Sequence, residues 1–174
     1  MTMKEMGLPA VVQIVGFKKS GKTTLTCRLV ERLASSGLRI GTIKHDGHDF
    51  EPDVPGTDSR RHREAGAVMS AVTSPSRTAF FENRSASLDE LLARMRAADV
   101  VLVEGWKQER FCKVAMIQKE EHWLPLSTLA QLGAVVTWNA ELLPKLRSLA
   151  RVPVYAFDET EEIADFVMEQ IRIT

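Results

Sequence analysis

The alternation of apolar runs with segments of helical spacing predicts a chain of strands and helices in turn. Short runs rich in valine and isoleucine are typical of buried strands, and apolar residues at intervals of three and four indicate helices with one buried face. The expected strands span residues 11–15, 38–44, 68–74, 78–83, 99–104, 112–117, 133–138 and 152–157. The expected helices span residues 22–36, 59–67, 87–97, 141–149 and 158–173. This order predicts an α/β sandwich with a mainly parallel sheet, as one domain over residues 1–174.

Two of the expected helices begin with the pattern of a capping box, in which side chains three residues apart satisfy each other's free N–H groups. Ser87 and Glu90 form this pattern at one helix start, and Asp158 and Glu161 form it at the other. The strands at 68–74 and 78–83 are close enough in sequence to pair as a hairpin through the intervening "PSR".

The segment "GFKKSGKT" (16–23) lies between the first expected strand and the first expected helix. Gly16 and Gly21 allow backbone conformations that turn several N–H groups toward one anion, and the following helix start adds positive potential. Lys22 is placed to reach the β- and γ-phosphates of a nucleotide, and the Thr23 hydroxyl is placed to bind Mg²⁺. The strand–loop–helix context therefore predicts a phosphate-binding loop rather than a solvated turn.

Two further lysines, Lys18 and Lys19, lie inside this loop. In some phosphate-loop proteins an extra lysine crosses to a partner's nucleotide, but it usually follows the first glycine directly, and Phe17 holds that position here. We expect Lys18 and Lys19 to be solvated or attracted to phosphate, not to act in a partner's site.

A nucleotide site also needs a carboxylate near Mg²⁺, usually at the carboxyl end of a buried strand. Glu104 ends the apolar run "DVVLVE" and is followed by glycine, which favours it as the acid on the metal side. The competing pattern "DVPG" (53–56) is short and lies in a polar loop. Asp46 or Asp53 remains a candidate second acid.

The polar segment 44–63 contains three of the four histidines of the chain. His45 and His48 are spaced like a metal pair, but without a nearby thiol or third ligand the spacing does not favour a zinc site. A charged loop after the second strand is placed to contact the γ-phosphate, Mg²⁺ or a partner. His45 and Asp58 are the candidates for positioning a catalytic water.

Composition narrows the class of protein. The 174 residues include 23 Lys+Arg and 23 Asp+Glu, so a net charge of zero gives no support for a nucleic-acid or membrane binder. We expect no export or membrane-spanning segment and a cytoplasmic protein. The two cysteines, Cys27 and Cys112, are expected to be buried and reduced.

Three segments together resemble the molybdopterin-guanine dinucleotide biosynthesis protein B family, MobB. They are "GFKKSGKTTL", "IKHDGHDFEPDVPGTDSRRHREAGA" and "VVLVEGWK", and the resemblance spans residues 11–107. The resemblance implies a dimeric P-loop NTPase-type protein that binds GTP with Mg²⁺, hydrolyses it slowly and assists the enzyme that attaches GMP to molybdopterin. Molybdopterin itself is a further candidate partner.

The resemblance also implies nucleotide contacts and metal ligands. The nucleotide contacts it implies are Gly16, Lys18, Lys19, Ser20, Gly21, Lys22, Thr23, Thr24, His45, Asp46, Thr73, Ser74 and Glu104. Its metal ligands are Thr23 and Glu104.

The sequence differs from GTPases that bind guanine tightly, because it lacks the N-K-x-D motif with which they recognise the base. The corresponding strand end contains Trp138 and Asn139, which could contact a base or simply pack. Two alternatives therefore stay open. One is a small-molecule kinase, to which Asp58 and Arg77 could contribute, and the other is a metal-insertion GTPase that uses His45 and His48.

Overall fold

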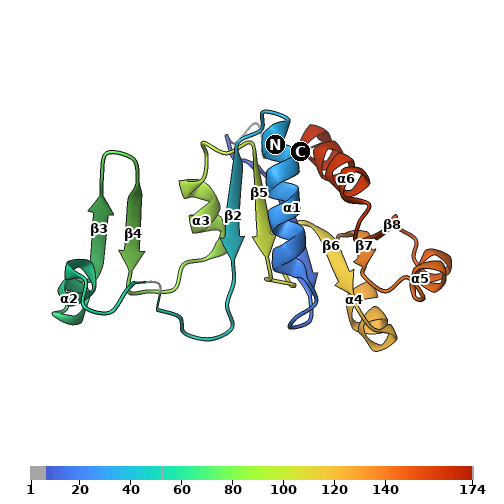
Figure 1. The fold of residues 1–174 in the computed structure, drawn as a ribbon, viewed down its shortest axis with the longest axis horizontal. Helices are drawn as coiled ribbons and strands as arrows, with labels where there is room; N and C mark the ends of the chain where they lie inside the picture. Colours follow the sequence, from blue (N-terminus) through green and yellow to red (C-terminus); the bar gives the residue numbers. More distant parts are fainter. Residues whose placement is uncertain (1–6, 52, 174) are drawn as a thin grey trace. The chain divides into compact units, whose positions relative to one another are not determined.

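A parallel β-sheet forms the centre of the computed structural model, which describes residues 7–51 and 53–173. The strand order is β2-β5-β1-β6-β7-β8, and every neighbouring pair is parallel (Figure 1). The strands are β1 (Ala10–Gly16), β2 (Ile40–Lys44), β5 (Val100–Glu104), β6 (Cys112–Ile117), β7 (Leu132–Thr137) and β8 (Val154–Ala156). The predicted α/β architecture with a mainly parallel sheet is confirmed.

Helices cover both faces of this sheet, which explains why β1 is buried at every position. The helices are α1 (Lys22–Ser35), α4 (Trp123–Ser127), α5 (Leu143–Leu149) and α6 (Thr160–Ile173), with the 3₁₀ turn η1 (Glu120–His122) before α4. Val12 and Ile14 pack with α1 and α6, whereas Val15 packs with α4 and α5. Successive strand residues thus point to opposite faces.

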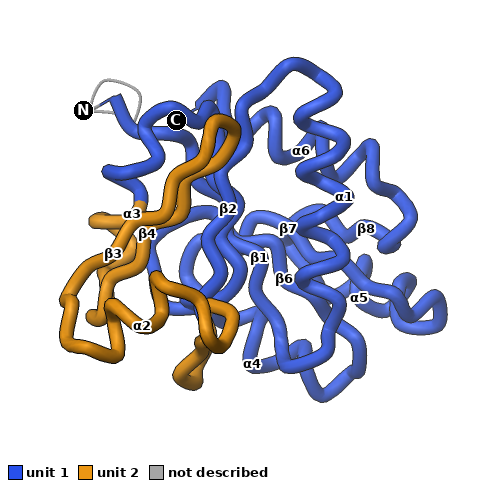
Figure 2. The backbone as a smooth tube through the Cα atoms, turned by 60° about the vertical axis from the view of Figure 1, so that its left-hand side comes forward, with its two compact units in different colours: residues 1–45, 92–174 blue, residues 46–91 orange. Residues whose placement is uncertain are grey.

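The chain divides into two compact units, which Figure 2 shows in different colours. Unit 1 contains residues 1–45 and 92–174 and holds the parallel sheet; unit 2 contains residues 46–91. In unit 2, α2 (Asp58–Glu64) precedes an antiparallel hairpin of β3 (Met69–Thr73) and β4 (Thr78–Glu82). Helix α3 (Leu88–Arg94) spans the boundary in sequence. The expected single domain over residues 1–174 remains a prediction.

Local sequence signals explain several elements. The predicted pairing of residues 68–74 with 78–83 is confirmed, with Val72 opposite Ala79. The capping box at Ser87 and Glu90 is also confirmed: the Glu90 N–H donates to Ser87 Oγ at 3.2 Å, and the Ser87 N–H donates to the Glu90 carboxylate at 2.8 Å. Within the described part of the chain, no helix has both the length and the apolar character needed to cross a membrane.

The expected burial of both cysteines is wrong for Cys27. Cys27 is exposed and Cys112 is half-buried, and burial raises the pKa of the Cys112 thiol. Helix α1 buries Leu25, Leu29 and Leu33, and a residue two positions after Leu25 faces away because an α-helix turns about 100° per residue.

The expected capping box at Asp158 and Glu161 does not form. Helix α6 begins at Thr160, two residues after the expected start at residue 158, and the carbonyl of Glu159 accepts the Ile163 N–H at 3.1 Å. Glu161 instead forms an ion pair with Arg32 of α1. The short elements η1 and α4 were not predicted, because "EEHWLPLS" has too few residues to show a helical period.

Candidate functional site

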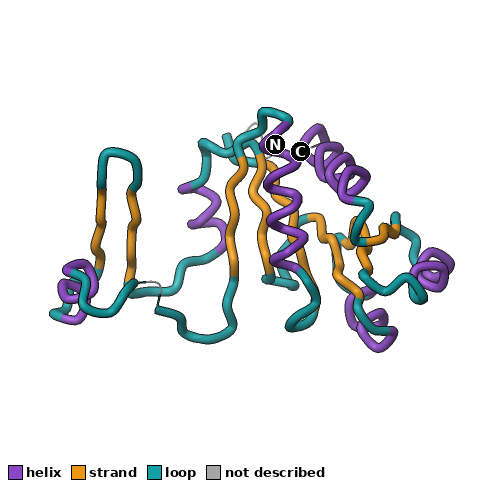
Figure 3. Tube along the Cα trace, in the orientation of Figure 1, coloured by secondary structure: helices purple, strands orange, loops and turns teal. Residues whose placement is uncertain are grey.

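The loop between β1 and α1 has the backbone of an anion cradle. Gly21 directly precedes α1 with φ of +92°, and Lys19 has φ of +61°. The Ser20 N–H donates to the Phe17 carbonyl at 3.3 Å, and the Leu25 N–H donates to the Gly21 carbonyl at 3.0 Å, where the helix begins (Figure 3). The loop therefore presents the free N–H groups of a helix start to its surroundings.

Lys22 is folded back onto this loop. Its Nζ donates to the Phe17 carbonyl at 2.8 Å. Burial lowers the pKa of Lys22, the nearby cations Lys107 and Lys44 lower it further, and Glu104 acts in the opposite direction. An ammonium in such surroundings gains from the arrival of an anion. Lys18 and Lys19 are exposed, as expected for solvated side chains.

Thr23 and Glu104 meet although they are 81 residues apart in sequence. The Thr23 hydroxyl lies 3.0 and 2.9 Å from the two Glu104 oxygens, and Glu104 is only 8% exposed. Strand β5 pairs with β1, so its last residue lies beside the start of the loop. A hydroxyl and a carboxylate oxygen are ligands that Mg²⁺ prefers, and this pair could hold one.

Trp138 supports the loop from the end of β7. Its Nε1 donates to the Ser20 carbonyl at 3.2 Å, and its ring stacks on Phe157. The Ser20 hydroxyl is buried and has no hydrogen-bond partner among the described residues. Asn139 forms a local turn, because its Oδ1 accepts the Glu141 N–H at 2.9 Å. The packing role that the sequence left open for Trp138 is therefore present.

Two buried polar residues near the site were not predicted. Gln13 of β1 and Lys113 of β6 have no exposed surface, and both donate to backbone carbonyls of the loop 105–111, which joins β5 to β6. Each interrupts an otherwise apolar strand in the sequence, "AVVQIVG" and "CKVAMI". That interruption was the available signal, because a buried polar side chain needs a partner.

His45 lies at the end of β2 in unit 1. Its N–H donates to the Glu104 carbonyl at 2.9 Å, and its ring lies 4.6 Å from the Trp106 ring, centre to centre. His48 belongs to unit 2. Among residues 7–51 and 53–173, no three His, Cys, Asp or Glu side chains gather as a metal-binding group.

The Asp53 carboxylate makes hydrogen bonds and an ion pair within unit 2. Its carboxylate accepts hydrogen bonds from Ser59 Oγ at 2.8 Å and Thr57 Oγ1 at 3.0 Å, and it lies 3.4 Å from Arg63 Nη2. The Ser59 hydrogen bond is the largest cause of a lowered pKa for Asp53. These contacts organise the start of α2 and favour Glu104 over Asp53 as the candidate metal acid.

The other predicted site residues also lie in unit 2. Thr73 Oγ1 lies 3.1 Å from Thr78 Oγ1 across the hairpin, and Ser74 Oγ accepts the Arg77 N–H at 3.1 Å. Thr73 and Ser74 thus belong to an antiparallel hairpin and not to the sheet that carries the phosphate loop. Asp58 is 86% exposed beside Arg61. Nucleotide contacts from these residues and from Asp46 remain predictions.

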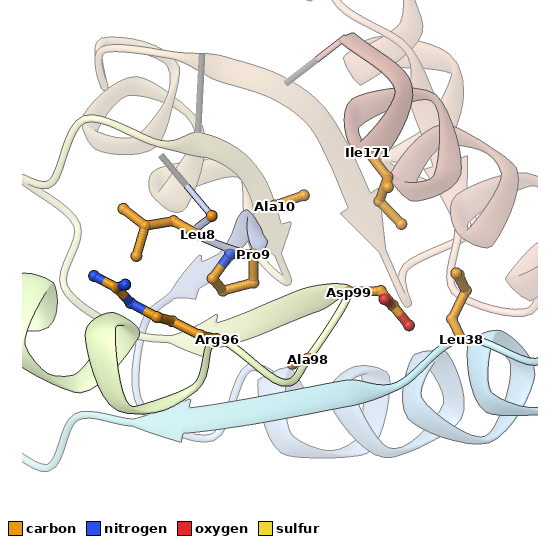
Figure 4. Close-up of a pocket in the computed structure, with 9 residues that line it drawn as sticks. Leu8, Pro9, Ala10, Leu38, Arg96, Ala98, Asp99 and Ile171 are labelled. Carbon is orange, nitrogen blue, oxygen red and sulfur yellow. The ribbon is translucent and has the colours of Figure 1, made fainter. Parts of the chain in front are cut away.

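A cavity of about 370 Å³ lies at the amino-terminal ends of β1 and β5, away from the phosphate loop at the carboxyl end of β1 (Figure 4). It is lined by Gly7, Leu8, Pro9, Ala10, Leu38, Arg96, Ala98, Asp99 and Ile171. Ala10 and Asp99 lie where β1 and β5 begin, and Arg39 binds the Asp99 carboxylate at 2.7 Å. The residues that line this cavity do not include the phosphate loop, Thr23 or Glu104, so we place the candidate site at the carboxyl ends of the strands, where those residues meet.

Comparison with known proteins agrees with this architecture. A probable molybdopterin-guanine dinucleotide biosynthesis adapter protein of Bacillus subtilis is 31% identical over 166 residues, which cover 93% of each chain. The molybdopterin-guanine dinucleotide biosynthesis adapter protein of Escherichia coli is 32% identical over 159 residues, 88% of each chain.

Solved structures show the same similarity. A MobB protein homolog from Bacillus stearothermophilus has a TM-score of 0.72 at 31% identity, covering 95% of this chain and 99% of that one. Bacillus subtilis MobB has a TM-score of 0.77 at 28% identity, covering 92% and 97%. The hydrogenase maturation factor HypB of Archaeoglobus fulgidus, at 20% identity, shares the fold with a TM-score of 0.57, and together with the MobB structures it confirms the predicted P-loop NTPase fold. The model of the family described as molybdopterin guanine dinucleotide synthesis protein B matches residues 11–138, and the chain belongs to this family, MobB.

Proposed function

We propose that this chain is an adapter in the synthesis of molybdopterin guanine dinucleotide, and that it binds GTP with Mg²⁺ and hydrolyses it slowly. The observation that carries the proposal is the meeting of Thr23 and Glu104 directly after a glycine-bounded loop that holds Lys22. The relatives from Bacillus subtilis and Escherichia coli are biosynthesis adapter proteins for molybdopterin-guanine dinucleotide, probable in the first case, which supports this pathway. The choice of GTP over ATP rests on the family resemblance.

Each part of the loop has a role in this proposal. The loop N–H groups and the start of α1 hold the phosphates, and Lys22 leaves the Phe17 carbonyl to bind the β- and γ-phosphates. The pair of Thr23 and Glu104 fits Mg²⁺, because both offer oxygen ligands and the carboxylate is largely shielded from water. When bound, Mg²⁺ neutralises charge on the phosphate oxygens.

Slow turnover follows from the residues near the loop. Hydrolysis needs a positioned water as well as charge neutralisation. His45 is the candidate from unit 1, and its ring packs against the ring of Trp106. Asp58 is solvent-exposed in unit 2. We therefore propose that a partner completes the catalytic arrangement, namely the enzyme that joins GMP to molybdopterin.

The test is phosphate release from GTP by the isolated protein, with and without that enzyme. We expect slow release alone and release several-fold faster with the enzyme, and no release by Lys22→Ala in either case because the phosphates lose a charge-assisted contact. Fast turnover by the isolated protein, unchanged by the enzyme, would point to a self-sufficient NTPase. Phosphate transfer to a small acceptor would favour the kinase alternative.

We also propose a homodimer. The β3–β4 hairpin is a two-stranded sheet whose Met69, Val72 and Phe80 are 51%, 46% and 55% exposed. Such hairpins are marginally stable alone in water, and exposed apolar side chains favour burial against another surface. We expect sedimentation equilibrium to give twice the 19.4 kDa of one chain. A purely monomeric protein at high micromolar concentration would contradict this.

A further inference from the structure

The loop 105–111 carries a lysine that lies beside the phosphate loop. Lys107 Nζ lies 4.5 Å from the centre of the Phe17 ring. The carbonyl of the same Phe17 accepts Lys22 Nζ at 2.8 Å. Two ammonium groups from distant parts of the chain thus converge on one residue of the loop. Like charges held together in this way raise the electrostatic energy of the free protein; the Glu104 carboxylate offsets part of this at Lys22, and a bound anion would offset more.

The loop 105–111 is held in place by hydrogen bonds from two buried side chains of the neighbouring strands. Gln13 Nε2 donates to the carbonyls of Gly105 at 3.2 Å and Trp106 at 2.6 Å. Lys113 Nζ donates to the carbonyl of Phe111 at 3.0 Å and to that of Glu109. Both side chains are fully buried, and a buried ammonium needs hydrogen-bond acceptors, which these carbonyls provide. These hydrogen bonds anchor the loop to β1 and β6 in the ligand-free protein.

The backbone of the loop is also constrained at its start. Gly105 has φ of +100°, and Trp106 has φ of +49°, which is uncommon for a residue with a side chain. This bend follows Glu104, the candidate metal acid, directly. Lys107 comes three residues after Glu104 and lies against Phe17 of the phosphate loop. Strained backbone of this kind persists when the surroundings determine it, and it is often found at functional sites.

We propose that Lys107 is a second phosphate-binding lysine, which contacts the terminal phosphate of a bound triphosphate and makes the site prefer triphosphate over diphosphate. This inference rests on the proposed function. Lys22 starts α1 and serves the phosphates that the loop holds, whereas Lys107 approaches from the β5–β6 loop. In this proposal the ammonium of Lys107 reaches the γ-phosphate, which extends beyond the phosphate loop. A diphosphate has no γ-phosphate and so gains no contact with Lys107.

The contact with Phe17 is suited to a resting position. A cation over a phenyl ring gains little where water reaches it, whereas a charge-assisted hydrogen bond to a phosphate oxygen is stronger. The flexible lysine stem allows the ammonium to move from the ring to the phosphate without moving the loop. The contact with the Phe17 ring thus keeps the Lys107 ammonium near the site, and little free energy is lost when the ammonium leaves the ring.

The test compares the Kd of a non-hydrolysable GTP analogue and of GDP, both with Mg²⁺. Lys107→Gln is expected to weaken binding of the analogue by about 10- to 100-fold, the scale of one hydrogen bond to a charged group, with little change for GDP. Lys107→Arg keeps the charge and is expected to restore most of the preference. Gln108→Ala is the matched control, because Gln108 is exposed in the same loop and carries no charge. It is expected to bind both nucleotides as the wild type does.

The outcomes separate this inference from the proposed function. Equal weakening of both nucleotides by Lys107→Gln, or no weakening of either, overturns the role of Lys107. A wild-type protein that binds neither nucleotide overturns the proposed function, and the inference with it. Weakening of both nucleotides by Lys22→Ala in the same assay confirms that the site under test is the phosphate loop.

Discussion

Gly21→Ala is expected to disable the phosphate loop, whereas Gly37→Ala, at the other end of the same helix, is expected to leave it intact. A Cβ at Gly21 would collide with the indole of Trp138, with Cε2 at 2.8 Å and Cζ2 at 2.9 Å. The indole cannot yield freely, because it stacks on Phe157 and donates to the Ser20 carbonyl. The loop must therefore shift, and we expect nucleotide hydrolysis to fall by roughly 100-fold, the scale of a misplacement of about 1 Å.

The control isolates the collision from the backbone strain. Gly37 has φ of +83°, close to the +92° of Gly21, but nothing lies within 4 Å of the position of its Cβ. Both variants bear the strain of a left-handed alanine, about 1–2 kcal/mol in the free energy of unfolding. Only Gly21→Ala should also weaken nucleotide binding. Urea unfolding and nucleotide titration of the two variants make the comparison, and normal nucleotide binding by Gly21→Ala would refute this account of the loop.

Glu104→Gln is expected to reduce Mg²⁺-dependent hydrolysis by about 100-fold, which corresponds to about 3 kcal/mol of transition-state stabilisation. Glutamine keeps an oxygen that can accept the Thr23 hydroxyl, now bonded at 2.9–3.0 Å, so the local packing survives while the charge is lost. The measurement is the hydrolysis rate as a function of Mg²⁺ concentration.

Asp53→Asn is the matched carboxylate-to-amide change. The Asp53 carboxylate binds Ser59, Thr57 and Arg63 within unit 2, so we expect a loss of stability there and an unchanged Mg²⁺ dependence. Because the pKa of Asp53 is lowered below the ordinary value of an aspartate, its stabilising contribution is present at neutral pH and is lost as the pH falls through that lowered pKa. Loss of Mg²⁺ dependence in Asp53→Asn alone would show that the choice of Glu104 is wrong.

Much of the fold could be predicted because its signals are local. The apolar run of β1, the glycines of the loop and the leucine spacing of α1 are contiguous in sequence, and each segment can be recognised without its neighbours. The meeting of Thr23 with Glu104 could also be anticipated, because parallel strands bring their carboxyl ends to one edge of a sheet. The hairpin and the Ser87–Glu90 box depend on residues close in sequence, and both formed.

Two predictions were wrong because contacts between distant parts of the chain decided the outcome. Glu161 could have capped α6, but Arg32 of α1 binds it. Cys27 is exposed because the helix face that packs on the sheet is set by Leu25 and Leu29. Nucleotide contacts by Thr73 and Ser74 stay a prediction; that their hairpin lies outside the parallel sheet depends on which strands pair, and a run of apolar residues does not specify its partner.

The sequence by itself determined that a glycine-bounded loop follows a buried strand and opens a helix, since those elements are defined by adjacent residues. Only the tertiary structure decided what surrounds that loop. Trp138 donates a hydrogen bond to the Ser20 carbonyl of the phosphate loop. Gln13 and Lys113 hold the loop 105–111, which places Lys107 against Phe17. The physical reason is burial: the Gln13 amide in an apolar strand must find a partner, and the identity of that partner depends on a fold that brings residues about 90 positions apart into contact, whereas Lys113 donates to carbonyls two and four positions away.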